Sequence, residues 1–250
     1  MSEVVLSLLA HPDDAEFLCA GSMARLVHER GWEAHIATMT PGDCGSADRG
    51  PEEISRIRRA EGAAAAKLLG GTYHCLEERD LLVCYNEPTL EKVVRLFREV
   101  RPSIVITHSP SDYMLDHEMT SVLARAAAFG APIRNYFLDR GHAPALEHIP
   151  HLYYADPIEG KDPLGRPVDA GFCIDITSTL DLKREMLCAH ASQRDWLLKH
   201  HGMDEYVKTM EEWAAARGAQ SGVAAAEGFR QHLGHSYPDF NLLGELLGAR

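Results

Sequence analysis

The chain has 250 residues, which suffices for one large α/β domain or two small ones, each with a buried core. Its formal net charge of −12 excludes a simple electrostatic attraction to nucleic acid or to an anionic membrane, since both attract clusters of lysine and arginine. We therefore expect a small, neutral or cationic ligand and no nucleic-acid partner. The six cysteines include no Cys-x-x-Cys pair, which is typical of a protein of the reducing cytoplasm.

Short β-type runs alternate with longer helical patterns from the N-terminus onward. In chain order the sequence predicts a strand at 4–9, a helix at 15–30, a strand at 33–39, a helix at 52–69, a weak strand near Tyr73, a helix at 90–100, a strand at 103–107, a helix at 117–129, and strands at 152–155 and 172–176. The first apolar run is too short to cross a bilayer, so we expect no transmembrane segment there. The alternation predicts an α/β fold with a mostly parallel sheet and helices on both faces.

The last third of the chain has a different pattern. Residues 141–171 contain five prolines, which predicts a long irregular excursion over the surface. From Leu180 to about Arg217 the pattern is helical with a break near Gly202, and the tail beyond is rich in Gly, Ala and His. No clear domain boundary is visible. We therefore expect a single domain over 1–250, with a core at about 1–180 and a helical C-terminal part at about 180–250.

The strongest chemical signal is the run His11-Pro12-Asp13-Asp14. It lies where the first strand gives way to the first helix, at the carboxyl edge of the sheet, where open α/β folds place their sites. His11 and Asp14 can both point at one Zn²⁺ at roughly 2.0–2.2 Å, while Asp13 holds a water. The alternative is an ordinary helix start, because Asp is a favoured N-cap and Pro is favoured at N1. The local pattern alone does not decide between the two.

A catalytic zinc needs a third protein ligand, and His117 is the candidate. It follows Asp116 at the start of the helix after the fourth strand, on the same edge of the sheet. Two histidines and one carboxylate leave a coordination position open for water, which distinguishes a catalytic zinc from a closed structural site. Taken alone, His117 is also consistent with a solvated residue at a helix start. Its pairing with His11 and Asp14 favours the metal ligand.

These motifs resemble those of the N-acetylglucosaminyl-phosphatidylinositol de-N-acetylase family, also called PIG-L or LmbE-like, whose members carry Ala-His-Pro-Asp-Asp-x-Glu after the first strand. The resemblance extends over most of the chain. Its segments are Ala10-His-Pro-Asp-Asp-Ala-Glu16, Thr40-Pro-Gly-Asp-Cys-Gly45, Arg58-x-x-Glu61, Asp116-His117, Asp175-Ile-Thr177 and His190-Ala-Ser-Gln193. The resemblance implies a Rossmann-like fold and zinc-dependent removal of acetyl from N-acetylglucosamine-type groups.

By the same resemblance His11, Asp14 and His117 match the metal ligands, Asp13 the general base, and Arg58 a residue that positions the substrate. Glu61 could hold the guanidinium of Arg58 in register, although an intrahelical ion pair worth about 0.2–0.5 kcal/mol is the simpler explanation of their spacing. The family often forms closed oligomers. We therefore expect a homo-oligomer. Together with the cysteine pattern described above, this predicts a cytoplasmic homo-oligomer.

One position departs from the family pattern. Many relatives have His-Pro-Asp-His where this chain has Met114-Leu115-Asp116-His117. In relatives the first of these histidines is thought to stabilise the oxyanion or to protonate the leaving amine, and a thioether can do neither. The sequence offers four substitutes and ranks none above the others: His108, His190, His232 and His235.

Two other functions fit part of the pattern. Paired aspartates after the first strand also suit Mg²⁺-dependent phosphoryl transfer, but Mg²⁺ prefers oxygen ligands, and two histidines favour zinc or another transition metal. The second alternative is a weakly catalytic or non-catalytic metal-binding module, because of Met114. The sequence favours a zinc-dependent amide hydrolase that acts on an N-acetylated sugar or glycoconjugate, whose identity the residues leave open.

Overall fold

The computed structural model describes residues 3–138, 140–193 and 205–250. Seven strands of this part form one sheet in the order β3-β2-β1-β4-β5-β7-β6. Five of them run parallel: β1 (Val4–Leu9), β2 (Glu33–Thr38), β3 (Thr72–Cys75), β4 (Ile104–Thr107) and β5 (His151–Ala155). Strand β7 (Ala226–Gln231) is antiparallel to both β5 and β6 (Phe172–Asp175). The predicted α/β fold with a mostly parallel sheet is confirmed.

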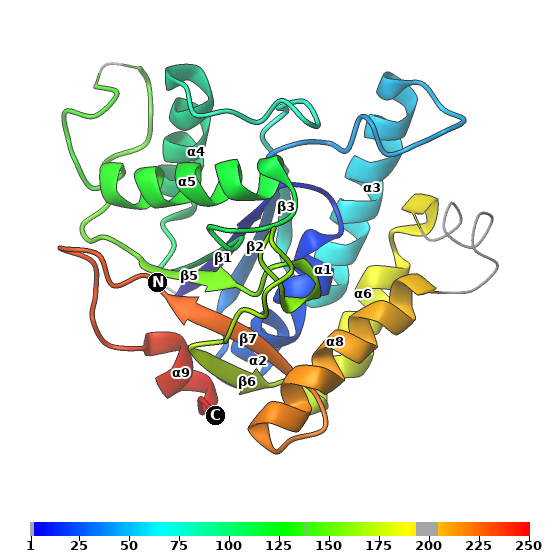
Figure 1. Ribbon diagram of the computed structural model, residues 1–250. Helices are drawn as coiled ribbons and strands as arrows, with labels where there is room; N and C mark the ends of the chain where they lie inside the picture. Colours follow the sequence, from blue (N-terminus) through cyan, green and yellow to red (C-terminus); the bar gives the residue numbers. More distant parts are fainter. Residues whose placement is uncertain (1–2, 139, 194–204) are drawn as a thin grey trace.

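Helices cover both faces of the sheet (Figure 1). Two of them, α4 (Glu87–Val100) and α5 (Leu115–Gly130), share one hydrophobic core with the sheet. The opposite core is built with α1 (Asp14–Leu18), α2 (Ala20–Arg30), α3 (Pro51–Leu69), α6 (Leu180–Cys188), α8 (Glu205–Ser221) and α9 (Leu242–Leu247). Strand β1 lies between these two layers, so every residue of its apolar run is buried, as expected for a central parallel strand.

Local signals in the sequence explain where several elements begin and end. The side chain of Asn86 accepts a hydrogen bond from the Thr89 backbone N–H and caps α4, which has a proline in its first turn. Helix α3 also begins with proline, at Pro51, and ends at Gly70 in the left-handed conformation. The helix predicted at 52–69 agrees closely with α3, whereas α4 begins at its Asn86 cap, before the predicted start at residue 90.

Two predictions about the elements were wrong. The helix expected at 15–30 is divided into α1 and α2 at Cys19. The C-terminal part was expected to be helical, yet β7 inserts between β5 and β6 in the sheet. The predicted break near Gly202 lies outside the described residues. The proline-rich stretch at 141–171 is irregular, as predicted, apart from β5 and one 3-10 turn at Ile158–Gly160.

The order of the strands determines where a site can form. The chain passes from β1 to β2 and β3 on one side, then returns to place β4 on the other side of β1. Open α/β sheets bind ligands at such a reversal, outside the carboxyl ends of the strands. The segment 10–16 follows β1 and the segment 108–117 follows β4, so the sheet brings the two together. No helix in the described ranges has the length and apolar character that a membrane span requires.

A buried ion pair fixes the unpredicted strand β7 to the helices. Lys183 Nζ lies 2.5 Å from Glu227 Oε1, and the carboxylate of Glu227 also accepts hydrogen bonds from the backbone N–H groups of Gly21 and Ser22 at the start of α2. Lys183 further donates to the Phe17 carbonyl. Glu227 therefore joins the sheet, α2 and α6 in one buried network.

Removing the cation of this pair should destabilise the fold strongly. Lys183→Met leaves the Glu227 carboxylate buried without its charge partner, which typically costs about 3–5 kcal/mol of unfolding free energy. Urea titration of the variant measures the loss. The matched control is Lys208→Met, which removes an exposed i,i+4 pair with Glu212 and should cost less than about 1 kcal/mol. Equal losses in the two variants would show that the buried pair stabilises the fold no more than the exposed one.

Candidate active site

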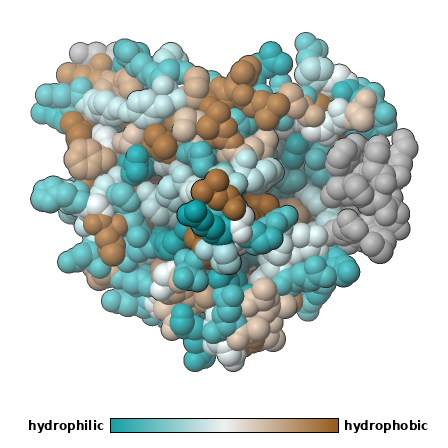
Figure 2. Space-filling view, viewed as in Figure 1, coloured by the Kyte–Doolittle hydropathy of each residue, from teal (hydrophilic) through white to brown (hydrophobic). Residues whose placement is uncertain are grey.

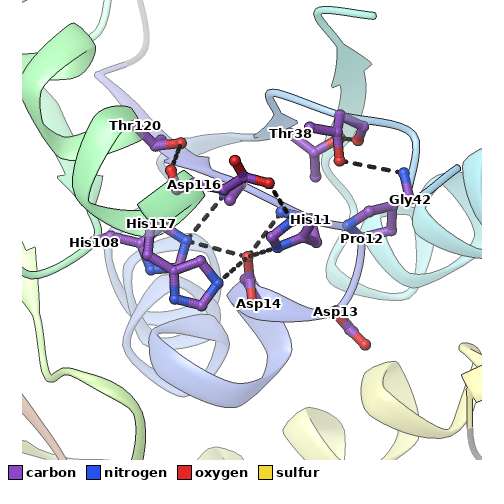
Figure 3. Close-up of polar contacts among 12 residues, drawn as sticks. His11, Pro12, Asp13, Asp14, Thr38, Gly42, His108, Asp116, His117 and Thr120 are labelled. Carbon is purple, nitrogen blue, oxygen red and sulfur yellow. Dashed lines mark hydrogen bonds and ion pairs between the residues drawn. The ribbon is translucent and has the colours of Figure 1, made fainter. Parts of the chain in front are cut away.

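Three side chains meet at the reversal point between β1 and β4. His11 and Asp14 come from the turn after β1, and His117 from the first turn of α5, and one ligand atom of each lies within 4.8 Å of the other two. Asp14 Oδ2 lies 3.4 Å from His11 Nδ1 and 3.7 Å from His117 Nε2 (Figure 3). All three residues are buried. The structure thus brings together the three side chains that the sequence proposed as metal ligands.

Carboxylates hold the outer nitrogens of both histidines. His11 Nε2 lies 3.2 Å from Asp116 Oδ2, and His117 Nδ1 lies 3.1 Å from Asp112 Oδ1. The inner nitrogens, His11 Nδ1 and His117 Nε2, therefore face Asp14. Metal-binding histidines usually donate their second ring N–H to a carboxylate in this way, which fixes the tautomer and the ring orientation. These orienting roles were not predicted from the sequence, although both aspartates lie within five residues of His117.

The charges of the cluster suit a bound cation. Burial alone raises the pKa of Asp14, but the charge of His117 and hydrogen bonds from His108 and His11 hold that pKa well below its usual value, so the carboxylate is ionised. Burial lowers the pKa of His108 to about 4, so its ring is neutral. Two imidazoles and one carboxylate are the ligand set of a zinc site that keeps one position open. The donors present therefore fit zinc or another transition metal better than Mg²⁺.

Asp13 faces away from this cluster, as Figure 3 shows. Its backbone has φ +106°, in the region that L-residues rarely adopt, and such strain is concentrated at functional sites. Arg58 Nη2 lies 3.4 Å from Asp13 Oδ1, and the Tyr206 hydroxyl on α8 donates to Asp13 Oδ2. Burial raises the pKa of the Asp13 carboxyl above its ordinary value, although the guanidinium of Arg58 opposes this shift. Sequence reasoning did not find Tyr206, because no local motif marks it.

Arg58 is held in a tight cradle. It donates to the Pro12 carbonyl at 2.6 Å, and a Cβ added at Gly42 or Gly45 would collide with its guanidinium. The two glycines of the segment 40–45 therefore leave room for this side chain. Arg58 Nε is buried and has no hydrogen-bond partner among the described residues. Arg58 also lines the pocket described next, where its guanidinium has the capacity to bind a polar group of a ligand.

A pocket of about 560 Å³ connects these groups to solvent. His11, Asp14 and His117 lie in its wall, as do Asp13 and Arg58; further lining residues are Phe17, Tyr113, Met114, Tyr206 and Trp213. The size is within the usual range for a small-molecule site. Met114, which replaces the histidine of many relatives, precedes α5 and lines this same pocket.

None of the four substitute histidines is placed to act on a ligand in this pocket, because none of them lines it. His108 is fully buried behind Asp14, 3.1 Å from its Oδ2, and stacks on His117. His190 is also fully buried, 3.3 Å from Glu16 Oε2. His232 instead contacts the Tyr154 hydroxyl.

The motif at 190–193 joins three other motifs. His190 pairs with Glu16, the Ser192 backbone and hydroxyl both donate to the Glu61 carboxylate, and Gln193 donates to the Gly45 carbonyl at 2.9 Å. The suggestion that Glu61 holds Arg58 was therefore wrong, since the carboxylate of Glu61 binds Ser192. This motif ties the end of α6 to the loops around the pocket.

Comparison with known proteins agrees with this geometry. Residues 6–128 match the sequence model of the PIG-L family, described as GlcNAc-PI de-N-acetylase. The 1D-myo-inositol 2-acetamido-2-deoxy-alpha-D-glucopyranoside deacetylase of Rhodococcus jostii is 27% identical over 244 residues, covering 77% of this chain and 82% of that protein. The 4-oxalmesaconate hydratase of Pseudomonas putida is 26% identical over 196 residues, covering 75% and 73%.

Solved structures share the fold. The N,N'-diacetylchitobiose deacetylase of Pyrococcus horikoshii superposes with a TM-score of 0.79 at 25% identity, over 96% of this chain and 89% of that one. The 4-carboxy-2-hydroxymuconate hydratase of Pseudomonas putida superposes with a TM-score of 0.76 at 22% identity, over 96% and 100%. The PIG-L resemblance that the motifs predicted is confirmed by the match of residues 6–128, and the relatives named here are enzymes.

The cluster predicts how variants will bind metal. Wild-type protein should hold about one zinc per chain, and Asp14→Ala should lose most of it because the central ligand is gone. Asp112→Asn, which only weakens the support of His117, should reduce zinc affinity roughly 10–100-fold. Elemental analysis and competition with a chelator measure both. Cys44→Ser is the control, since Cys44 belongs to a different group of possible ligands with Asp43 and Asp80. Loss of zinc from this control alone would move the metal to that group.

Proposed function

We propose that the protein is a zinc-dependent hydrolase that removes an acetyl group from an N-acetylglucosamine-type substrate. The observation that carries the proposal is the set of two carboxylate-oriented histidines around Asp14, in the wall of a pocket that also contains Asp13. The name of the Rhodococcus jostii relative, a deacetylase of a 2-acetamido sugar, supports the same reaction. Arg58, which lines the pocket, would bind a polar group of the sugar.

The residues of the chain have separate tasks in this reaction. Zinc, when bound by His11, Asp14 and His117, lowers the pKa of a water and stabilises negative charge on the acyl oxygen. Asp13 takes the proton of the attacking water, and its raised pKa brings the carboxyl closer to the pH at which a base works best. The protonated Asp13 then returns the proton to the nitrogen of the leaving amine. Arg58 and Tyr206 hold the two oxygens of Asp13 in place throughout.

Met114 favours a second candidate, the addition of water to an unsaturated acid. Amide hydrolysis must protonate a leaving amine, whereas hydration of a carbon–carbon double bond has no leaving group: the hydroxyl adds to one carbon and Asp13 would return the proton of the water to the other carbon. A Pseudomonas putida relative is named as a hydratase. Arg58 would then bind the carboxylate of the acid. Acetate release from N-acetylated sugars, compared with loss of the absorbance of conjugated unsaturated acids, separates the two reactions.

Two further proposals concern the state of the protein in the cell. We propose a cytoplasmic homo-oligomer. The free state of all six cysteines supports a reducing compartment. A single monomer peak in light scattering at micromolar concentration would contradict the oligomer.

Asp13→Asn separates metal binding from catalysis. The amide keeps the size of the side chain but removes the basic carboxylate, so zinc should stay while proton transfer fails. Since general acid–base groups typically contribute 10²–10⁴-fold, kcat should fall at least about a hundredfold with KM nearly unchanged. Acetate release by zinc-loaded protein measures this. If the variant retains more than roughly a tenth of the wild-type kcat, another group is the principal base.

Met114→His tests whether the missing imidazole limits deacetylation. The new ring would stand in the pocket at the start of α5, where it can donate a proton to the amine or the oxyanion. We expect kcat for acetate release to rise, with unchanged zinc content. A lower kcat with zinc retained would show that the site is shaped for different chemistry, such as the hydration described above.

A further inference from the structure

A second cavity, of about 290 Å³, lies beside the catalytic pocket. Its walls come mainly from α1, α8, β7 and the segment 156–169, which follows β5. The two cavities share Phe17 and Trp213, whose ring centroids are 5.5 Å apart, so these aromatic side chains form a partition between them. The segment adds to this partition, because Ile158 lines the catalytic pocket whereas its neighbour Glu159 lines the second cavity. We call this second space the α8 cavity.

The interior of the α8 cavity is mostly apolar. The rings of Phe17 and Trp213 line it, together with Leu18 and Ala214. Since an apolar cavity of about 150 Å³ can hold benzene, the α8 cavity has room for one aromatic ring with a short chain. Figure 2, viewed as in Figure 1, shows mainly hydrophilic residues around the middle of the visible face, where the segment 156–169 lies. These polar surroundings favour a small ligand inside the cavity over an apolar docking surface.

The charged side chains of the α8 cavity leave one carboxylate without a partner. Each of the three cations in the lining is paired with a carboxylate of the same lining: Lys183 Nζ with Glu227 Oε1 at 2.5 Å, Arg217 Nε with Asp156 Oδ2 at 2.6 Å, and Lys161 Nζ with Glu159 Oε2 at 3.1 Å. Asp169 is the fourth carboxylate, and it has no hydrogen bond or ion pair among the described residues. Because Asp169 is also exposed, its carboxylate is accessible to a ligand that enters the cavity.

An unpaired carboxylate near aromatic rings favours a cationic ligand. A protonated amine would form an ion pair with Asp169, and the faces of Trp213 and Phe17 attract a cation through the ring quadrupole. The cavity also lies at the C-terminal end of α8, which supplies Arg217 and Gln220 to the lining, and the negative end of a helix dipole favours positive charge. An anion would be repelled by Asp169 and would find the three cations already paired.

We propose that the α8 cavity is a second ligand site, which binds a small organic ammonium ion with an aromatic or aliphatic body. The ammonium group pairs with Asp169, and the body packs against Phe17 and Trp213. This site is separate from the catalytic pocket and does not depend on the proposed deacetylase reaction. Phe17 also packs edge-on against Tyr206, with 5.0 Å between the ring centroids, and Tyr206 holds Asp13. The α8 cavity is therefore joined to the proposed base by two side-chain contacts.

Calorimetric titration of the zinc-loaded protein with 2-phenylethylammonium, and with 2-phenylethanol as its neutral counterpart, tests this site. Wild type should bind the ammonium ion at least about fivefold more tightly than the alcohol, because the ion pair and the cation–π contact each contribute a few-fold. Asp169→Asn should weaken binding of the ammonium ion about threefold and leave binding of the alcohol unchanged, since only a charge is removed. The control is Asp239→Asn, which alters an exposed aspartate outside the cavity and should change neither affinity.

Two neighbouring positions on α8 show whether the probe binds in this cavity. Ala216 lines it and Ala215 does not, and both residues are exposed. Ala216→Phe should fill the space and weaken binding of both probes at least about tenfold, whereas Ala215→Phe should leave both affinities unchanged. The inference is overturned if Ala216→Phe keeps the wild-type affinity, if wild type binds the two probes equally, or if it binds neither at millimolar concentration. No acetylated substrate is used, so failure of the deacetylase proposal would leave these outcomes unaltered.

Discussion

The carboxylate of Asp14 is the point on which the organisation of the site depends. It accepts the His11 backbone N–H at 2.8 Å, and its Oδ2 lies within 4 Å of ring nitrogens of His11, His108 and His117. These partners come from two segments that are about a hundred residues apart and meet only because β4 pairs with β1. A buried carboxylate is costly unless it is compensated by hydrogen bonds or by positive charge. The fold therefore supplies a position at which a cation is stabilised.

The side chains that orient His11 and His117 are themselves held by hydrogen bonds from the backbone. Asp116 and Asp112 orient the histidines, and each of these aspartates also accepts backbone N–H groups, from Leu81 and Val83 in one case and from Ile158 in the other. The loops that form the mouth of the pocket are thus bonded to the same carboxylates that position the ligands. On the opposite side, Arg58 and Tyr206 hold Asp13. The mouth of the pocket and the cluster of His11, Asp14 and His117 are therefore connected through two carboxylates.

The sequence predicted those parts of the molecule whose signals are local. Strand β1 is a continuous apolar run, and the residues at 11–14 indicate their chemistry by type and spacing. To place these residues near each other in space, one further rule was enough: the carboxyl ends of parallel strands lie at the same edge of the sheet. The approach of His117 to Asp14 follows from that rule. This is why the three proposed ligands could be named before their distances were known.

The remaining parts depend on contacts between distant residues. Strand β7 contains Glu227, Gly228 and Arg230, which disfavour a buried strand when the sequence is considered alone. In the structure Glu227 binds Lys183, and a Cβ at position 228 would collide with the carboxylate of Asp156. The contact between Tyr206 and Asp13 joins residues 193 positions apart, and no periodicity reveals it. Glu61 was assigned to the wrong partner for the same reason.

Locating the metal is the most direct test of the proposed zinc site. Crystals of the zinc-loaded protein, measured at the zinc absorption edge, should show one anomalous peak at roughly 2.0–2.2 Å from His11 Nδ1, His117 Nε2 and the Asp14 carboxylate. The side chains of Asp112 and Asp116 should remain on the outer ring nitrogens. A peak only at the group formed by Asp43, Cys44 and Asp80, with no anomalous signal beside Asp14, would contradict the proposed site.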